Sequence, residues 1–320
     1  MKENSFLYLL QDITQQLKDG DILNYGKRFS KKTINSYEQV FNAMSLHNYN
    51  FDLDSVDLNN VSSRRERLKV SRQIQRYVND YLNILQEKKY HPNTRKSHLK
   101  TIRTTLKKAE KYYGYMFPQL ESMRELKTEV VALNPYQVEL IHSTMPINER
   151  LHDVWYYTRI ALYSCMRISD LINFECSMDG NIVTILTKKG MGSLATFYLP
   201  DDVMFFLKEN GSPKICKNHY RYLLKELLQN YDEFWKKKTI YKYDHDGNPV
   251  QETKYLWELI TPHKLRSSGI TYHLSGGLSE MDVRRISGHA NNSTAFYRYV
   301  KASDTKSLKQ QEENSVIKIG

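Results

Sequence analysis

Hydrophobic residues recur at helical spacing in the first third of the chain. One apolar stripe is formed, at three- and four-residue steps, by Ile74, Val78, Tyr81, Leu82 and Leu85. After a break at residues 88–94, a second stripe is formed by Leu99, Ile102, Leu106 and Ala109. Pro92 ends the first helix, and Asn93 or Thr94 can cap the next one. The pattern therefore predicts an antiparallel pair of helices.

The same periodicity sets the extent of a first, helical domain. A further helix is expected from Ser30 or Thr33 through Met44, so residues 1–130 are expected to be all-helical. Asn134 is placed to cap a helix whose first residue is Pro135, and this marks the start of a second domain. We expect that domain to span residues 135–302, followed by a polar tail at residues 303–320.

The second domain mixes helices with a little β-structure. Residues 154–173 are predicted to form one long, mostly buried helix. Residues 181–187 are β-branched and apolar, a lysine-containing turn follows at 188–192, and residues 195–199 run back as a hairpin. From residue 201 onward helices dominate, apart from a polar loop at residues 241–252. The expected fold class is mainly α with a small β-hairpin.

Charge narrows the class of partner. The net charge is +11, and 26% of the 320 residues are charged. No apolar run approaches the roughly 20 residues that a membrane-spanning helix needs. The apolar stretch at the N-terminus is too short for a secretory signal, so we expect a cytoplasmic protein. An excess of positive charge suits a polyanionic partner, because binding phosphates releases condensed counterions.

The basic residues are concentrated on the predicted helix pair. Between residues 64 and 111 only Glu66, Asp80, Glu87 and Glu110 oppose them. This excess of basic residues on the outer surface of the helix pair predicts contact with double-stranded DNA. The DNA-binding candidates are Arg64, Arg65, Arg72, Arg76, Arg95, Lys96, Lys100, Arg103 and Lys107.

A second set of residues has the chemistry for a phosphodiester. Arg167 lies in an apolar stretch, and His263 and Arg266 are three residues apart, on one face of a helix that begins after Pro262. His289 follows a glycine, and two tyrosines come after it. Guanidinium groups hold phosphate, imidazoles move protons and a phenol can act as the nucleophile. No cofactor loop is present, and Asp244, His245 and Asp246 are adjacent in a turn, which disfavours a metal site.

In this order, these motifs resemble the tyrosine recombinases, the phage and transposon integrases. The first catalytic box of that family resembles residues 162–171, the second resembles residues 261–271, and the last resembles residues 286–289 with 293–301. Residues 33–37 and 90–94 are similar to its helical core-binding domain, which clamps DNA. The resemblance covers nearly the whole chain and implies a mixed α/β catalytic domain after the core-binding domain.

The resemblance also implies roles for the candidate residues. A tyrosine attacks the scissile phosphate and forms a 3′-phosphotyrosyl bond, without metal or cofactor. Arg167 and Arg266 would hold the non-bridging oxygens, His263 would manage the tyrosine proton and His289 would bind the phosphate. A hairpin lysine would protonate the leaving 5′-oxygen, and Asp170 would support the cluster. A homotetramer on DNA is implied, and the tail is expected to dock on a neighbouring protomer.

Two assignments stay open at the level of sequence. Strand alternation sends Lys188 and Lys189 to opposite faces, and the family pattern of Lys, any residue, Gly favours Lys188. The family tyrosine usually lies nine residues after the histidine, whereas Tyr297 and Tyr299 lie eight and ten after His289. Residues 296–301 resemble the family's closing pattern, Phe-x-Lys/Arg-Tyr-Ile/Val-Lys, and this resemblance favours Tyr299 as the nucleophile. Two other functions are also open: relaxation of DNA by a type IB topoisomerase, and regulation by a catalytically silent DNA-binding protein.

Overall fold

The fold is taken from a computed structural model, which describes residues 5–53, 63–113, 120–126, 129, 131–188, 193–290, 296, 297 and 300. Contacts divide the chain into two compact units. Unit 1 comprises Met1–Thr128 together with Tyr241–Val250, and unit 2 comprises Glu129–Ile240 and Gln251–Gly320. None of the described helices is long and apolar enough to cross a bilayer.

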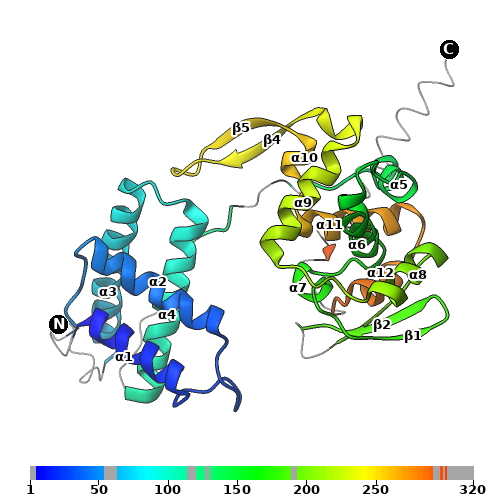
Figure 1. Cartoon of the computed structure of the whole chain (residues 1–320). Helices are drawn as coiled ribbons and strands as arrows, with labels where there is room; N and C mark the ends of the chain where they lie inside the picture. The colour runs from blue at the N-terminus through cyan, green and yellow to red at the C-terminus, as the bar shows by residue number, and fades with distance from the viewer. Residues whose placement is uncertain are drawn as a thin grey trace. The chain divides into compact units, whose positions relative to one another are not determined.

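The described residues of unit 1 form four helices, shown from blue to cyan-green in Figure 1: α1 (Phe6–Asp19), α2 (Lys31–Leu46), α3 (Arg64–Glu87) and α4 (Pro92–Tyr113). Serines begin the first three, because Ser5, Ser30 and Ser63 each accept a hydrogen bond from a backbone N–H of the first turn. The stripes predicted on α3 and α4 are buried, and Ile74, Val78 and Ile102 are fully inaccessible. The predicted helix pair is confirmed.

Unit 2 holds its helices against a small antiparallel sheet with the order β1-β2-β3. Its strands are β1 (Cys176–Asp179), β2 (Ile182–Leu186) and β3 (Leu194–Tyr198). Strand β1 is an addition to the predicted hairpin. The helices before and after the sheet are α5 (Pro135–Ser143), α6 (His152–Ser164), α7 (Ile168–Leu171), α8 (Asp201–Asn210), α9 (Lys217–Gln229), α10 (Leu256–Leu259), α11 (Pro262–Ser275) and α12 (Glu280–Ser287), with 3-10 turns η2 (Glu149–Leu151) and η3 (Asp232–Trp235).

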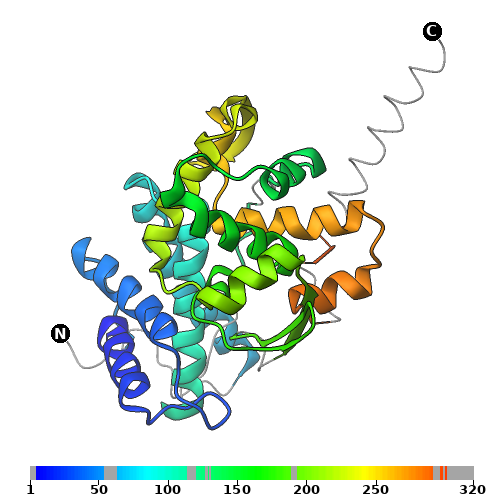
Figure 2. The same cartoon turned by 45° about the vertical axis from the view of Figure 1, so that its right-hand side comes forward.

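Two packing relations in unit 2 position the candidate site. Helix α11 packs along α6, and α12 packs against β3. In Figure 2, the dark orange helix α12 lies beside the green sheet. Asn134 caps α5 with Pro135 in the first turn, as predicted. The mainly helical class with small sheets is confirmed.

The prediction of one helix over residues 154–173 is wrong. Helix α6 ends at Ser164, and Cys165 takes a left-handed conformation with φ of 50°. Arg167 then has extended backbone and begins the short helix α7. The apolar run 161–166 gave no local signal of this break, which follows from the tight packing of Cys165 against α11.

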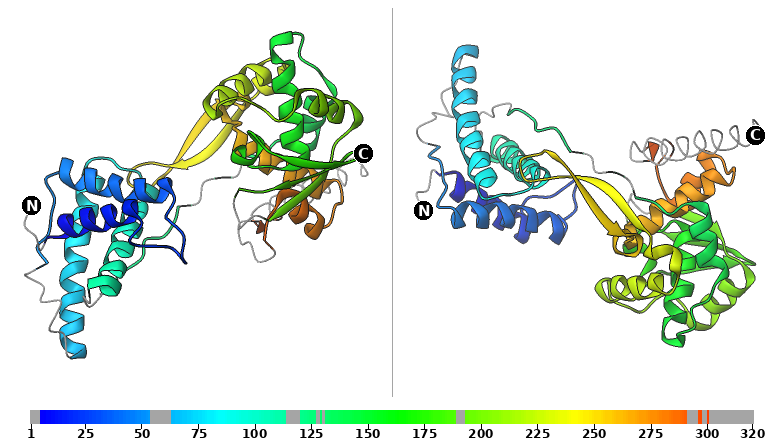
Figure 3. Two further views of the ribbon diagram at one scale, coloured as in Figure 1. Left: turned by 60° about the horizontal axis from the view of Figure 1, so that its bottom comes forward. Right: turned by 90° about the horizontal axis from the view of Figure 1, so that it is seen from above.

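The predicted polar loop at 241–252 is also wrong, because it is part of a second hairpin, β4 (Lys237–Tyr243) and β5 (Pro249–Tyr255), shown as the yellow ribbon in Figure 3. Along β4 only Ile240 is buried, so no apolar alternation announces the strand. The Asp244 carboxylate accepts backbone N–H groups of Asp246 and Asn248 and closes the turn. Residues 241–250, assigned from sequence to the second domain, group with unit 1.

Candidate active site

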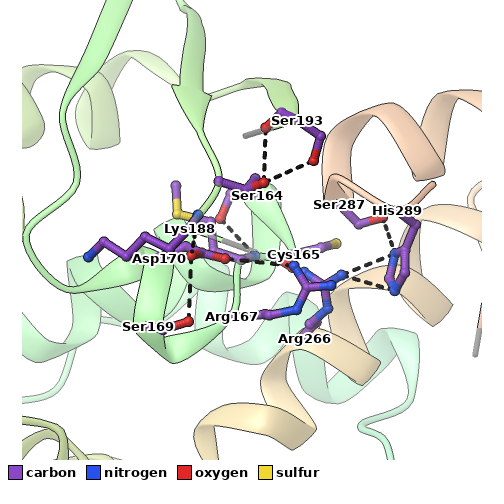
Figure 4. A network of polar contacts seen from close by, with 12 residues as sticks. Ser164, Cys165, Arg167, Ser169, Asp170, Lys188, Ser193, Arg266, Ser287 and His289 are labelled. Carbon is purple, nitrogen blue, oxygen red and sulfur yellow. Dashed lines mark hydrogen bonds and ion pairs between the residues drawn. The ribbon is translucent and has the colours of Figure 1, made fainter. Parts of the chain in front are cut away.

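Arg266 lies at the centre of a polar cluster in unit 2 (Figure 4). It is 2% exposed, its Nη1 donates to the Cys165 carbonyl, and its Nη2 lies 3.0 and 3.1 Å from the two ring nitrogens of His289. Gly269, one turn along α11, permits this approach, since a Cβ there would lie 2.3 Å from the Leu162 carbonyl oxygen. Close helix packing therefore sets the position of the guanidinium.

Arg167 reaches the same cluster from the break after α6. Its side chain is 25% exposed, and its Nη1 lies 3.8 Å from Oδ2 of the buried Asp170. That separation is too long for a hydrogen bond, and among the described residues Nη1 has no hydrogen-bond partner. The guanidinium is thus held by charge, with donor capacity left for an anion.

Asp170 links this arginine to the hairpin. Its Oδ1 accepts the backbone N–H of Lys188 at 3.1 Å, and the Lys188 ammonium donates to the Ile172 carbonyl at 2.9 Å. Gly288 lies close to the same strand end, since a Cβ there would be 2.9 Å from the Thr187 methyl group and its φ is +62°. The end of β2 and the Gly-His turn are therefore neighbours, whereas the Lys188 ammonium is directed to the Ile172 carbonyl, away from His289 (Figure 4). The alternative, Lys189, lies outside the described residues.

Burial and the neighbouring cations keep the His289 ring neutral. Burial first, and then the charges of Arg266, Arg167 and Arg284, lower the pKa of the His289 imidazole to about 3. The Ser287 hydroxyl lies 2.7 Å from its Nδ1. A neutral imidazole can accept a proton from one neighbour while it donates to another, which suits contact with a phosphate oxygen.

His263 lies in the first turn of α11 with an exposed side chain, three residues before Arg266 on the same helix. An exposed imidazole there is accessible to a substrate that contacts the cluster. Of the two tyrosines, Tyr297 is 51% exposed, and its ring lies 5.2 Å from the Arg284 guanidinium. Tyr299 lies outside the described residues.

The basic residues predicted to bind DNA occupy different surfaces of unit 1. Lys100 and Lys107 line a groove of about 1150 Å³ between α2 and α4, together with Lys32, Lys108 and Lys111. Arg65, Arg72 and Arg76 line a separate hollow of about 730 Å³ along α3, and Arg64 is exposed beside them. Lys96 lies 3.6 Å from Glu125, and Arg103 is half-buried.

Arg95 does not join these surfaces. It is 6% exposed, its Nη2 donates to the His245 carbonyl at 3.0 Å, and its Nη1 donates to the Gln86 side chain. Arg95 therefore holds the β4–β5 turn within unit 1.

Sequence reasoning missed several members of these sites. Lys32 lies outside the basic run, and Arg284, Ser287 and the Cys165 carbonyl were not singled out. The position of Arg284, five residues before His289 in the sequence, was the available signal. Within the described part of the chain, no three His, Cys, Asp or Glu residues gather as a metal site would require.

Comparisons with known proteins bear on the fold. No protein-family model and no curated protein matches the chain. A lambda integrase tetramer bound to a Holliday junction is similar, with a TM-score of 0.58 and 12% identity over 92% of this chain and 76% of that one. The Tn1549 transposon integrase in complex with a circular intermediate DNA has a TM-score of 0.57 and 14% identity, over 91% and 94% of the two chains.

The XerH site-specific recombinase bound to a palindromic difH substrate is also similar, with a TM-score of 0.51 and 13% identity over 92% of this chain and 90% of that one. These proteins are tyrosine recombinases. The chain therefore has the tyrosine-recombinase fold, and the fold expected from the sequence motifs is confirmed.

Proposed function

We propose that this chain is a site-specific recombinase that cuts and rejoins duplex DNA through a 3′-phosphotyrosyl intermediate. The observation that carries the proposal is the convergence of Arg167, Arg266 and His289, which come from separate segments and meet around one point. Three positive or polar groups directed at one place suit a phosphate. The similar integrases and recombinase were bound to DNA, which supports the same substrate class here.

The proposed chemistry assigns each group a step. Tyr299 attacks the phosphorus, the bond to the 5′-oxygen breaks, and Lys188 protonates that oxygen as it leaves. His263 takes the tyrosine proton, while Arg167 and Arg266 stabilise the charge on the non-bridging oxygens. The buried Nη1 of Arg167, without a hydrogen-bond partner among the described residues, supports this last role. Asp170 positions Arg167 and the hairpin.

The phosphotyrosyl bond keeps the energy of the phosphodiester, so the reaction as proposed uses no metal, ATP or other cofactor. Attack by the 5′-hydroxyl of a second strand reverses the chemistry and completes strand transfer. We assign residues 135–302 to this catalytic role, apart from the turn at residues 241–250, which groups with unit 1. The tail at residues 303–320, proposed from sequence to dock on a neighbouring protomer, lies outside the described residues.

Unit 1 would bind the DNA backbone as a core-binding domain, broadly residues 1–130. The groove between α2 and α4 supports this, because it is lined by lysines and by the hydroxyl-bearing residues Ser30, Thr33 and Thr104. Lysines and hydroxyls are common phosphate contacts. We leave Arg95 out of this interface, since its guanidinium is bonded internally.

Recombination joins two cut duplexes, so we propose a homotetramer on DNA, like the lambda integrase tetramer bound to a Holliday junction. Action on DNA also agrees with the cytoplasmic location expected from the sequence.

The test is covalent capture on nicked suicide duplexes tiled across the DNA that flanks the gene. After cleavage the short strand diffuses away, so a protein–DNA adduct accumulates. We expect the adduct with wild type and with Tyr297→Phe, and none with Tyr299→Phe.

Three other outcomes would reject parts of the proposal. An adduct that persists in Tyr299→Phe and disappears in Tyr297→Phe reassigns the nucleophile. Relaxation of plasmids that lack any captured site favours a type IB topoisomerase. DNA binding with no adduct on any duplex favours a silent regulator.

A further inference from the structure

Arg284 is a buried arginine that the proposed chemistry does not use. It lies on α12, five residues before His289, and is 7% exposed. An arginine is rarely buried so deeply unless its charge and its hydrogen-bond donors have partners. The partners of Arg284 therefore indicate what the buried charge does.

These partners come from three places. Nη1 donates to the Ala290 carbonyl at 3.1 Å, directly after the candidate catalytic His289. Nη2 lies 3.8 Å from a carboxylate oxygen of Glu280, one helical turn earlier on α12. The guanidinium carbon lies 4.1 Å from the Phe296 ring centre and 5.2 Å from that of Tyr297. One side chain thus joins the Gly-His turn to the segment that carries the tyrosines. This tyrosine segment contacts Arg284 through Phe296 and Tyr297.

Phe296 in turn connects that segment to the phosphate-binding residues. Its ring is fully buried in a small apolar cluster with Cys165, Ile270 and Val283, and the His289 ring meets it edge-on at 5.3 Å. Cys165 is also the residue whose carbonyl binds Arg266. A shift of the Phe296 ring would therefore change the place of the tyrosine segment relative to Arg266 and His289.

We propose that Arg284 is a positioning residue: by stacking on Phe296 and Tyr297, it holds the tyrosine segment in register with the phosphate-binding cluster. A planar guanidinium can stack on a ring while its edge donates hydrogen bonds, which a lysine ammonium cannot do in the same way. The inference rests on the proposed function. It also gives Tyr297 a stacking role, which agrees with Tyr299 as the nucleophile.

The test compares Arg284→Gln and Arg284→Lys with a matched control, Arg285→Gln. Arg285 is the next residue on α12, but its side chain is 66% exposed. The readouts are the single-turnover rate of adduct formation at saturating DNA and the affinity for the same duplex, namely one on which wild type forms the adduct. We expect Arg284→Gln to slow adduct formation about tenfold, with an unchanged affinity. Arg284→Lys should fold, keep the charge and recover part of the rate, and Arg285→Gln should match wild type.

A second arm tests whether Arg284 acts through the ring. In a Phe296→Leu background, Arg284→Gln should slow adduct formation far less than it does alone, because the shared contact is already lost. Equal rates for Arg284→Lys and wild type would overturn the stacking argument. A loss that saturating DNA restores would make Arg284 a DNA contact and overturn the proposal. Absence of an adduct with wild type on every duplex rejects the recombinase function itself. Adduct formation by Arg284→Gln at the rate of wild type is a different result, which rejects only the role proposed for Arg284.

Discussion

Replacing Gly269 by alanine tests the close packing of α11 on α6. The added Cβ would lie 2.3 Å from the Leu162 carbonyl oxygen and 2.9 Å from the Cys165 sulfur, whereas ordinary contacts begin at 3.4 Å. The first of these atoms is backbone, so it cannot rotate away. The two helices must therefore separate for the side chain to fit.

Two opposing effects set the change in unfolding free energy of Gly269→Ala. Overpacking a tight interior contact costs about 3 kcal/mol when backbone must move. Alanine gains about 1 kcal/mol over glycine in a helix. The net loss is about 2 kcal/mol, or a fall of about 4–8 °C in Tm for a unit of this size. The separation also draws Arg266, on the same helix, away from Cys165, so adduct formation should slow.

The assay is urea denaturation followed by tryptophan fluorescence. The chain has three tryptophans, Trp155, Trp235 and Trp257, and all belong to unit 2, so the signal reports that unit alone. Gly276→Ala is the matched control at the end of the same helix, where a Cβ would make only ordinary contact at 3.4 Å. Gly269→Ala with the same unfolding midpoint as wild type would refute the packing argument.

Three further predictions concern pH, salt and helix capping. The pKa of His289 is about 3 when folded against an ordinary value of 6.5, so unfolded chains bind more protons between those values. Urea titrations should therefore show that wild type loses more unfolding free energy than His289→Asn as the pH falls from about 7 to 5. Equal losses in the two proteins would contradict this. In DNA-binding anisotropy, Lys107→Gln should reduce the slope of log K against log salt by about 0.9, and Arg95→Gln should leave it unchanged. Asn134→Ala should lower the unfolding free energy of unit 2 by about 1 kcal/mol, and no change would mean that its cap is dispensable.

Local patterns were sufficient where neighbours in sequence decide the structure. The stripes on α3 and α4 and the Asn134 cap involve residues within a few positions of each other, and all were predictable. The catalytic motifs were readable for a similar reason, since their residue types and order lie along the chain. Strands β4 and β5 were not, because they lack an apolar stripe and depend on pairing with each other.

The sequence by itself thus determined the helical class and the inventory of phosphate-binding groups. Tertiary structure decided where those groups lie. The break at Cys165 depends on α11, a hundred residues further along, and it allows Arg167 to meet Arg266 and His289. Arg95 looks like a surface cation in sequence, yet the His245 carbonyl, 150 residues away, turns it inward. Burial and convergence depend on contacts between distant segments, and no local pattern encodes those contacts.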